Sequence, residues 1–199
     1  MKTLLLVLTL CASSAVYSQD RFFRSDAAIG GAFTIGNFKA YGISASAEPK
    51  FFFNENISVG LRLEGDVLFG GSIEGTSGDV SIGLSSRAAY GLKGEYYLGT
   101  GNTKPFFGLT AGMYTQANIG TNVQGSGVGV SASAVRAFGI GPELGVTFGN
   151  FRISGIYNFV PGTDLVSVTT SVGGVETVNV GRSYFVIHLG FRAFGINDN

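Results

Sequence analysis

Hydrophobic and polar side chains alternate with a period of two along most of the chain. Over residues 57–69 one face reads Ile57, Val59, Leu61, Leu63, Gly65, Val67 and Phe69, and the other reads Ser58, Gly60, Arg62, Glu64, Asp66 and Leu68. The same alternation recurs over residues 80–98 and 184–192. A period of two is typical of strands with two different faces, and no segment sustains the helical period of 3.6. The pattern therefore predicts an all-β protein.

Eight segments carry this alternation, and the connections between them differ in length. The predicted strands are 26–36, 38–53, 57–70, 79–99, 105–119, 131–149, 151–161 and 177–195. The connections at 54–56, 100–104 and 149–150 are short, those at 71–78, 120–130 and 162–176 are long, and Gly36-Asn37 is one tight turn on the long side. Short turns at one rim and long loops at the other are typical of outer-membrane barrels, which places the short turns and both termini in the periplasm.

The polar face indicates which solvent surrounds the barrel. It mixes small residues with charges of both signs, which suits the narrow interior of an eight-stranded barrel. A cation facing lipid near the bilayer midplane instead costs about 2–4 kcal/mol. We therefore predict an eight-stranded antiparallel up-and-down transmembrane β-barrel with the charges inside. The predicted polar network of the lumen comprises Glu48, Lys50, Arg62, Glu64, Asp66, Arg87, Lys93, Glu95, Glu143, Arg152, His188 and Arg192.

Aromatic residues gather near the predicted short turns. Such clustering indicates an interfacial girdle, where aromatic rings sit at the level of the lipid headgroups. The predicted girdle comprises Phe51, Phe53, Tyr96, Tyr97, Phe106, Phe107, Phe148, Phe151 and Phe194.

Composition narrows the functional classes. Hydrophobic residues make up 45% of the 199 residues and charged residues only 13%, which excludes a disordered chain. The formal net charge is +0, so the electrostatic footprint of a nucleic-acid-binding protein is absent. A single cysteine, Cys11, excludes a disulfide framework and a cysteine-based zinc site.

The first 18 residues have the features of a secretory signal peptide. Lys2 precedes the apolar run from Leu4 to Leu10, and small residues follow before a cleavage position ahead of Gln19. The apolar run is far shorter than the roughly 20 residues of a membrane-spanning helix. We expect residues 1–18 to be removed and residues 19–199 to form one barrel domain.

The mature segment resembles the small eight-stranded outer-membrane proteins of the OmpX, OmpW and OmpA-barrel group. The resemblance rests on the signal, the eight amphipathic segments, the alternating loop lengths and the C-terminal strand from Tyr184 to Phe194. It implies a location in the bacterial outer membrane, contact with outer-membrane lipid and a monomeric state. It identifies an architecture shared by proteins of many functions.

Two of the long connections continue the alternation. Residues 165–172 and 175–180 flank Gly173-Gly174, and residues 117–123 and 128–134 flank residues 124–127. Hairpins there extend the later strands beyond the membrane as a partial sheet with unpaired edges, and such edges accept a strand from another protein. We expect an extracellular partner at loops 120–130 and 162–176. The alternative is a taller rim without a partner.

Residues with catalytic potential have simpler structural interpretations. Glu64 and Asp66 share a face, as the carboxylates of a glycosidase do, but Arg62 shares that face too and predicts a salt-bridge network. His188 is the only histidine, whereas a zinc site requires three or four ligands. The His-x-Ser pattern of lipid deacylases requires serine where Gly190 stands. We therefore expect no catalytic residue, no metal and no cofactor.

Three functional classes follow from these patterns. The first is a structural or adhesin-like surface barrel whose lumen is plugged by side chains. The second is a narrow OmpW-like passage for small apolar molecules, which needs an apolar funnel and a lateral opening. The third, an outer-leaflet lipid-modifying enzyme, is disfavoured by the residues named above. Charge pairing across the lumen distinguishes the first class from the second.

Overall fold

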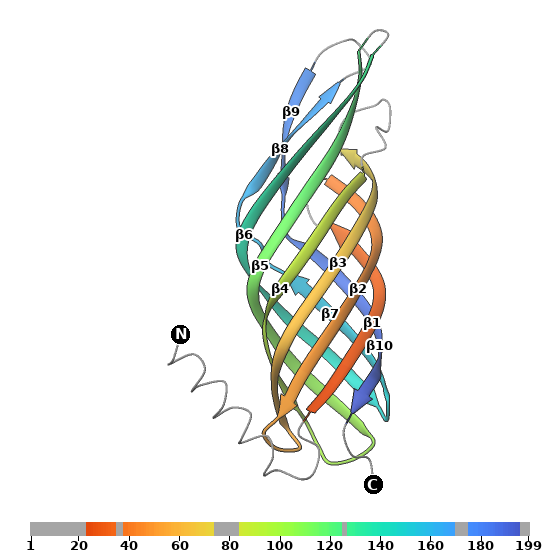
Figure 1. Ribbon diagram of the computed structural model, residues 1–199, viewed down its shortest axis with the longest axis vertical. Helices are drawn as coiled ribbons and strands as arrows, with labels where there is room; N and C mark the ends of the chain where they lie inside the picture. Colours follow the sequence, from red (N-terminus) through yellow and green to blue (C-terminus); the bar gives the residue numbers. More distant parts are fainter. Residues whose placement is uncertain (1–22, 35–37, 74–83, 125–126, 170–174, 196–199) are drawn as a thin grey trace, which may run out of the picture.

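The structure is a computed structural model that describes residues 23–34, 38–73, 84–124, 127–169 and 175–195. Eight of its strands close into an antiparallel barrel in the order β1-β10-β7-β6-β5-β4-β3-β2, and β8 and β9 form a separate two-stranded sheet (Figure 1). The strands are β1 (Phe23–Thr34), β2 (Phe38–Phe52), β3 (Ile57–Ile73), β4 (Leu84–Tyr97), β5 (Thr103–Gln124), β6 (Gly127–Phe148), β7 (Phe151–Asn158), β8 (Thr163–Thr169), β9 (Val175–Gly181) and β10 (Tyr184–Gly195). The predicted fold class is confirmed.

The first and last strands close the wall. Ala28 on β1 lies opposite Gly190 on β10 and opposite Ser46 on β2, so β1 is hydrogen-bonded on both sides. The short turns predicted at 54–56 and 149–150 join neighbouring strands at the end where β1 begins and β10 ends (Figure 1). Gly149 takes a positive φ of 56° in its turn, a conformation that favours glycine.

The other end departs from the predicted boundaries. The predicted loop at 120–130 is mostly strand, because β5 and β6 stay paired up to Gln124 opposite Gly127. The predicted loop at 162–176 contains β8 and most of its hairpin with β9, in which Thr169 lies opposite Val175. Both hairpins predicted within the long connections are therefore confirmed, but they do not join into one partial sheet.

The predicted segment 177–195 is two strands, β9 and β10. The two strands are separated by Arg182 and Ser183, which belong to neither strand. At Ser183 the side chain makes the following hydrogen bonds. The Val160 amide donates to Ser183 Oγ at 3.2 Å, and Ser183 Oγ donates to the Val160 carbonyl at 3.4 Å. The predicted segment 151–161 likewise ends early, at Asn158. The signal peptide and the Gly36-Asn37 turn lie outside the described residues.

The two faces of each strand are those that the alternation predicts. Leu61 is 49% exposed on the outside of β3, while its neighbour Arg62 is 2% exposed on the inside. On β4 and β10 the outward residues include Leu92 and Ile187, and the inward ones include Lys93 and His188. An exterior of large apolar side chains around a charged interior is the reverse of a water-soluble barrel. Such an exterior is stable in contact with hydrocarbon.

The predicted aromatic girdle is correct for its outward members and wrong for two residues. Phe51, Phe53, Tyr96, Phe107, Phe148 and Phe151 are exposed, while the side chain of Phe194 is not described. Tyr97 and Phe106 instead lie in the lumen, each 2% exposed, with ring centroids 5.4 Å apart. Because successive side chains of a strand point to opposite faces, only one residue of each pair Tyr96-Tyr97 and Phe106-Phe107 faces outward.

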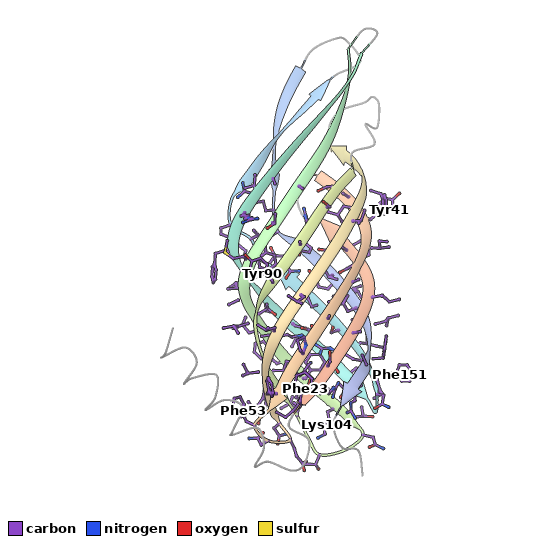
Figure 2. The ribbon with its side chains drawn as sticks, viewed as in Figure 1. Phe23, Tyr41, Phe53, Tyr90, Lys104 and Phe151 are labelled. Atoms are coloured by element: carbon purple, nitrogen blue, oxygen red, sulfur yellow. The ribbon has the colours of Figure 1, made fainter. Side chains whose placement is uncertain are left out.

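A second aromatic row marks the opposite end of the apolar band. Phe33, Tyr41 and Phe69 are neighbours in the strand register and are all exposed. Figure 2 shows Tyr41 near the end that carries the hairpins, and Phe53 and Phe151 at the short-turn end. Phe51 and Tyr41 are ten residues apart on β2. At about 3.4 Å per residue and a tilt of about 40°, the rows are about 26 Å apart, close to the apolar band of about 25 Å in outer-membrane barrels.

Candidate functional site

A compact ionic cluster fills the lumen near the short-turn end. It comprises Asp26, Glu48, Lys50, Lys93, Glu95, Glu143 and Arg152, all buried. Arg152 lies at its centre, with Nη1 2.9 Å from Glu48 Oε2 and 2.8 Å from Glu95 Oε1. Its Nη2 forms an ion pair with Glu143. We call these seven side chains the inner cluster.

The two lysines complete the inner cluster. Lys50 Nζ lies 2.9 Å from Asp26 Oδ2 and 2.7 Å from Glu95 Oε2. Lys93 Nζ lies 2.7 Å from Glu48 Oε1 and 2.5 Å from Glu143 Oε2. The residues come from β1, β2, β4, β6 and β7, so the ion pairs connect opposite walls. A buried charge is tolerated when several opposite charges and hydrogen bonds surround it, as they do here.

A second polar group occupies the lumen toward the hairpin end. Arg62 and Glu64 form an ion pair. Glu64 Oε1 also accepts from the Tyr184 hydroxyl at 2.8 Å and from Asn158 Nδ2 at 3.3 Å. Tyr114 donates to Asn158 Oδ1 at 3.0 Å, which connects β5 to β7. The predicted carboxylate Glu64 thus takes part in one ion pair and accepts two further hydrogen bonds.

The remaining predicted residues occupy the same lumen but do not all meet. Arg87 Nε donates to Gln116 Oε1 at 3.1 Å, and Asp66 lies opposite Arg87 in the strand register. His188 Nε2 is 2.9 Å from Ser44 Oγ. Arg192 lies near the short-turn end of β10 and is only partly buried.

Sequence reasoning missed two members of the charged interior. Asp26 is 2% exposed and contacts Lys50, and Arg24 forms an ion pair with Asp26. Two features explain why they were not predicted. The two faces of β1 differ little in hydrophobicity, because they carry the small residues Ala27, Ala28, Gly30 and Gly31. A register shift between Ser25 and Asp26 also interrupts the period of two. The charge of Asp26 in a segment of small residues was the one feature that could have indicated an inward position.

The chemistry that the lumen can perform is limited by access. Ser44 and His188 form the hydrogen-bonded pair that activates nucleophiles in hydrolases, but both side chains are sealed inside the barrel. Among the described residues, no three His, Cys, Asp or Glu side chains are placed to hold a metal ion. The described part of the chain also contains no helix long and apolar enough to cross a membrane.

The hairpin end presents an open strand edge. β6 pairs with β7 only from Glu143 to Phe148, with one further bridge between Ile140 and Phe159. From Gly127 to Gly139, the described residues give β6 a partner on one side only, namely β5. We call this segment the β6 edge. Figure 1 shows the β5-β6 hairpin rising beyond the ends of β2, β3 and β4.

Comparison with solved structures identifies the fold. The crystal structure of Neisserial surface protein A is 16% identical with a TM-score of 0.50, over 86% of this chain and 95% of that chain. Ail of Yersinia pestis is 14% identical with a TM-score of 0.43, over 86% and 98%. The N-terminal β-barrel domain of Pseudomonas aeruginosa OprF is 18% identical with a TM-score of 0.39, over 86% and 96%. No protein-family model and no curated protein matches the sequence. The predicted resemblance to small eight-stranded outer-membrane barrels is confirmed at the level of the fold.

Proposed function

We propose that this chain is a non-enzymatic, monomeric barrel of the bacterial outer membrane whose lumen is closed and whose β5-β6 hairpin acts at the cell surface as an adhesin-like interaction site. The observation that carries the proposal is the combination of an ion-paired lumen with a protruding, one-sided strand edge. The exposed apolar band supports the membrane location. The short turns then face the periplasm and the hairpins face outward.

The ionic clusters argue against a conducting channel. The inner cluster connects five strands across the lumen through Arg152 and two lysines. The ion pairs of the lysines span 2.5–3.3 Å. The cavity at the hairpin end has a volume of about 10 Å³, about the space that one water molecule requires. A passage for apolar molecules needs an apolar funnel, whereas this lumen is charged. The purified protein in planar bilayers should therefore show no stable conductance, and stable single-channel steps would favour the passage instead.

The β6 edge supplies the means of interaction. Its unpaired backbone groups match those of an extended polypeptide, and strand addition uses main-chain hydrogen bonds for affinity. The occupant that we propose is an extended segment of a protein on another cell surface. Because β5 and β6 are paired residue by residue up to Gln124, the edge is held in an extended form before binding.

A register-preserving deletion tests the proposal. Removing residues 120–123 together with 128–131 deletes the pairs from Gly120–Ser131 to Val123–Val128 and leaves the pairing below intact. The matched control replaces residues 165–178 of the β8-β9 hairpin with a short turn, which leaves the β6 edge unchanged. Adhesion of cells displaying each variant to cultured cells should fall with the first deletion and persist with the second. Unchanged adhesion after the first deletion, at equal surface display, would contradict the proposed role of the β6 edge in adhesion.

A further inference from the structure

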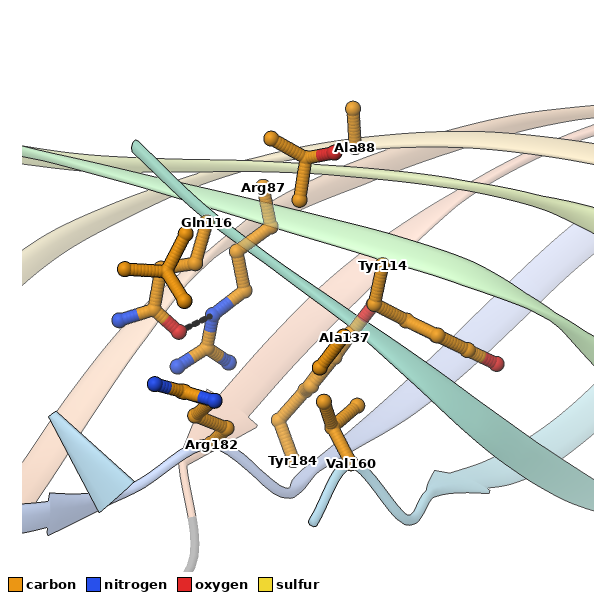
Figure 3. Close-up of a pocket in the computed structure, with 10 residues that line it drawn as sticks. Arg87, Ala88, Tyr114, Gln116, Ala137, Val160, Arg182 and Tyr184 are labelled. Atoms are coloured by element: carbon orange, nitrogen blue, oxygen red, sulfur yellow. Dashed lines mark hydrogen bonds between the residues drawn. The ribbon is translucent and has the colours of Figure 1, made fainter. Parts of the chain in front are cut away.

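The β8-β9 hairpin leaves the barrel beside the β6 edge. Val160 and Arg182, from the two segments that flank the hairpin, line one small cavity together with Val135 and Ala137 of the edge (Figure 3). The cavity has a volume of only about 10 Å³, so the base of the hairpin lies close to β6. Among the described residues, β8 pairs only with β9. A strand paired on one side therefore begins next to an edge that is paired on one side.

The pairing between β6 and β7 keeps one register up to its last bridge. From the pair Phe148–Phe151 to the isolated bridge Ile140–Phe159, the residue numbers of the two partners always add to 299. Ile140 and Phe159 exchange both main-chain hydrogen bonds, at 3.0 and 2.8 Å, and such pairs recur at every second residue of an antiparallel ladder. Extending the register past the bridge sets β8 opposite the β6 edge. The hydrogen-bonded pairs on β8 are then Arg136–Thr163, Ala134–Leu165, Ala132–Ser167 and Val130–Thr169.

Two residues explain why the pairing stops after Phe159. The next hydrogen-bonded pair of the ladder joins Phe138 to Pro161, and proline has no amide proton to donate. Gly162 then takes a φ of 101°, which turns the chain out of the ladder. Glycine also adopts extended conformations at little cost, so Gly162 is suited to act as a hinge. Neither residue prevents pairing beyond it.

The contacts at the base of the hairpin allow both arrangements. The Val160 amide donates to Ser183 Oγ, away from β6, and continued pairing on the β6 side leaves this bond in place. Arg182 Nη1 donates to the Pro161 carbonyl at 3.4 Å, and this carbonyl is the group that the Phe138 amide reaches in the extended register. A hydrogen bond of that length is weak. Pairing of β8 with β6 therefore exchanges one weak hydrogen bond for a run of main-chain hydrogen bonds.

We propose that β8 alternates between the open arrangement of this structure and one in which it pairs with the β6 edge in the register of β7. In the paired arrangement β8 uses the backbone groups that a partner strand requires, so β8 and the partner exclude each other. The hairpin then regulates access to the β6 edge. This regulatory role rests on the proposed function, whereas the pairing of β8 with β6 does not.

Disulfide trapping in the full chain tests the register. Positions 133 and 166 form a non-hydrogen-bonded pair in the paired arrangement, with Cα atoms about 4.5 Å apart, which is within the range that a disulfide requires. The test variant carries Ser133→Cys and Val166→Cys. The matched control carries Gly129→Cys and Val166→Cys, which moves one thiol by four residues, about 14 Å along β6. Ala117→Cys with Ala134→Cys joins opposite positions of the existing β5-β6 ladder and is the positive control.

Diamide accepts the two electrons and two protons of each thiol pair, and gel mobility measures the rate of oxidation on displaying cells. The 133–166 pair should oxidise at least about tenfold faster than the 129–166 pair, because only the former reaches disulfide geometry in the proposed register. Equal rates for these two pairs would overturn the proposal. Absence of a 133–166 disulfide while the positive control oxidises would overturn it as well.

Adhesion of the same cells tests the regulatory role. The disulfide-linked 133–166 form should lose adhesion to cultured cells, and reduction with dithiothreitol should restore it. Full adhesion of the linked form would show that β8 does not cover the edge. A wild type that fails to adhere would contradict the proposed function, and the oxidation rates would still decide whether β8 pairs with β6.

Discussion

Arg152 on β7 donates to Glu48 on β2 at 2.9 Å, although the two strands are three positions apart around the barrel. In the other direction Arg152 reaches Glu95 on β4, again three positions away, at 2.8 Å. One guanidinium therefore ties together walls that face each other. The ionic residues therefore form one network that connects opposite walls of the lumen, and not a set of separate ion pairs.

Replacing Arg152 with methionine should destabilise the barrel strongly. The change leaves Glu48, Glu95 and Glu143 without their shared cation, and breaking a buried ionic cluster on one side costs about 3–5 kcal/mol. Urea unfolding in lipid vesicles measures the loss. Arg136→Met, at an exposed side chain, is the control and should change the free energy of unfolding by less than about 0.5 kcal/mol. Equal stability of the two variants would contradict the stabilising role of Arg152 across the lumen.

An arginine at the outward position Leu63 should also destabilise the protein, for a different reason. Leu63 is exposed midway between the two aromatic rows, so the new charge would lie near the bilayer midplane. The expected cost is about 2–4 kcal/mol, whereas Phe53→Arg at the rim should cost about 0–1 kcal/mol. Unfolding in vesicles compares the two, and a free-energy cost at position 53 as large as that at position 63 would argue against a lipid-facing wall.

Glycines on β4 should differ in their tolerance of alanine. A Cβ at Gly91 would stand 2.5 Å from the Ala111 carbonyl oxygen, while a Cβ at Gly94 meets nothing within 4 Å. Gly91→Ala should therefore destabilise by about 1–3 kcal/mol through overpacking. Gly94→Ala on the same strand should be neutral or slightly stabilising. Heat-induced unfolding in detergent measures the stability of both variants. Similar unfolding midpoints would show that the close approach of β4 and β5 at Gly91 is not required for stability.

The hydroxyl of Tyr184 should contribute to stability. It donates to the buried Glu64 carboxylate at 2.8 Å, and a hydrogen bond to a charged group contributes about 1.5–3 kcal/mol. Tyr184→Phe should lose a free energy of that order in urea unfolding. Tyr157→Phe is the control because that ring is exposed on the outer wall. If Tyr184→Phe lost no more unfolding free energy than the control, the ion pair with Arg62 and the hydrogen bond from Asn158 would be sufficient to stabilise the buried Glu64 carboxylate.

The sequence was sufficient to predict faces wherever large and charged side chains alternate. On β3, Leu61 and Arg62 differ so much in hydrophobicity that their opposite directions could be predicted. On β1 the Ala and Gly residues removed that contrast, and Asp26 was missed. Adjacent aromatics such as Tyr96 and Tyr97 were grouped by kind, although strand geometry separates them.

The candidate site was less predictable because its contacts join distant strands. The alternation placed Arg152 and Glu48 on inward faces, but it did not say that they meet across the lumen. The break at Arg182 and Ser183 depends on hydrogen bonds to Val160, which lies 23 residues away from Ser183.

Quenching of a single introduced tryptophan by lipids brominated on their acyl chains tests the inverted barrel most directly. The chain contains no tryptophan, and Phe106 and Phe107 are adjacent, with exposures of 2% and 48%. In vesicles, Phe107→Trp should be quenched strongly and Phe106→Trp weakly. Equal quenching, or stronger quenching at position 106, would contradict the arrangement of apolar side chains toward lipid and charged side chains within.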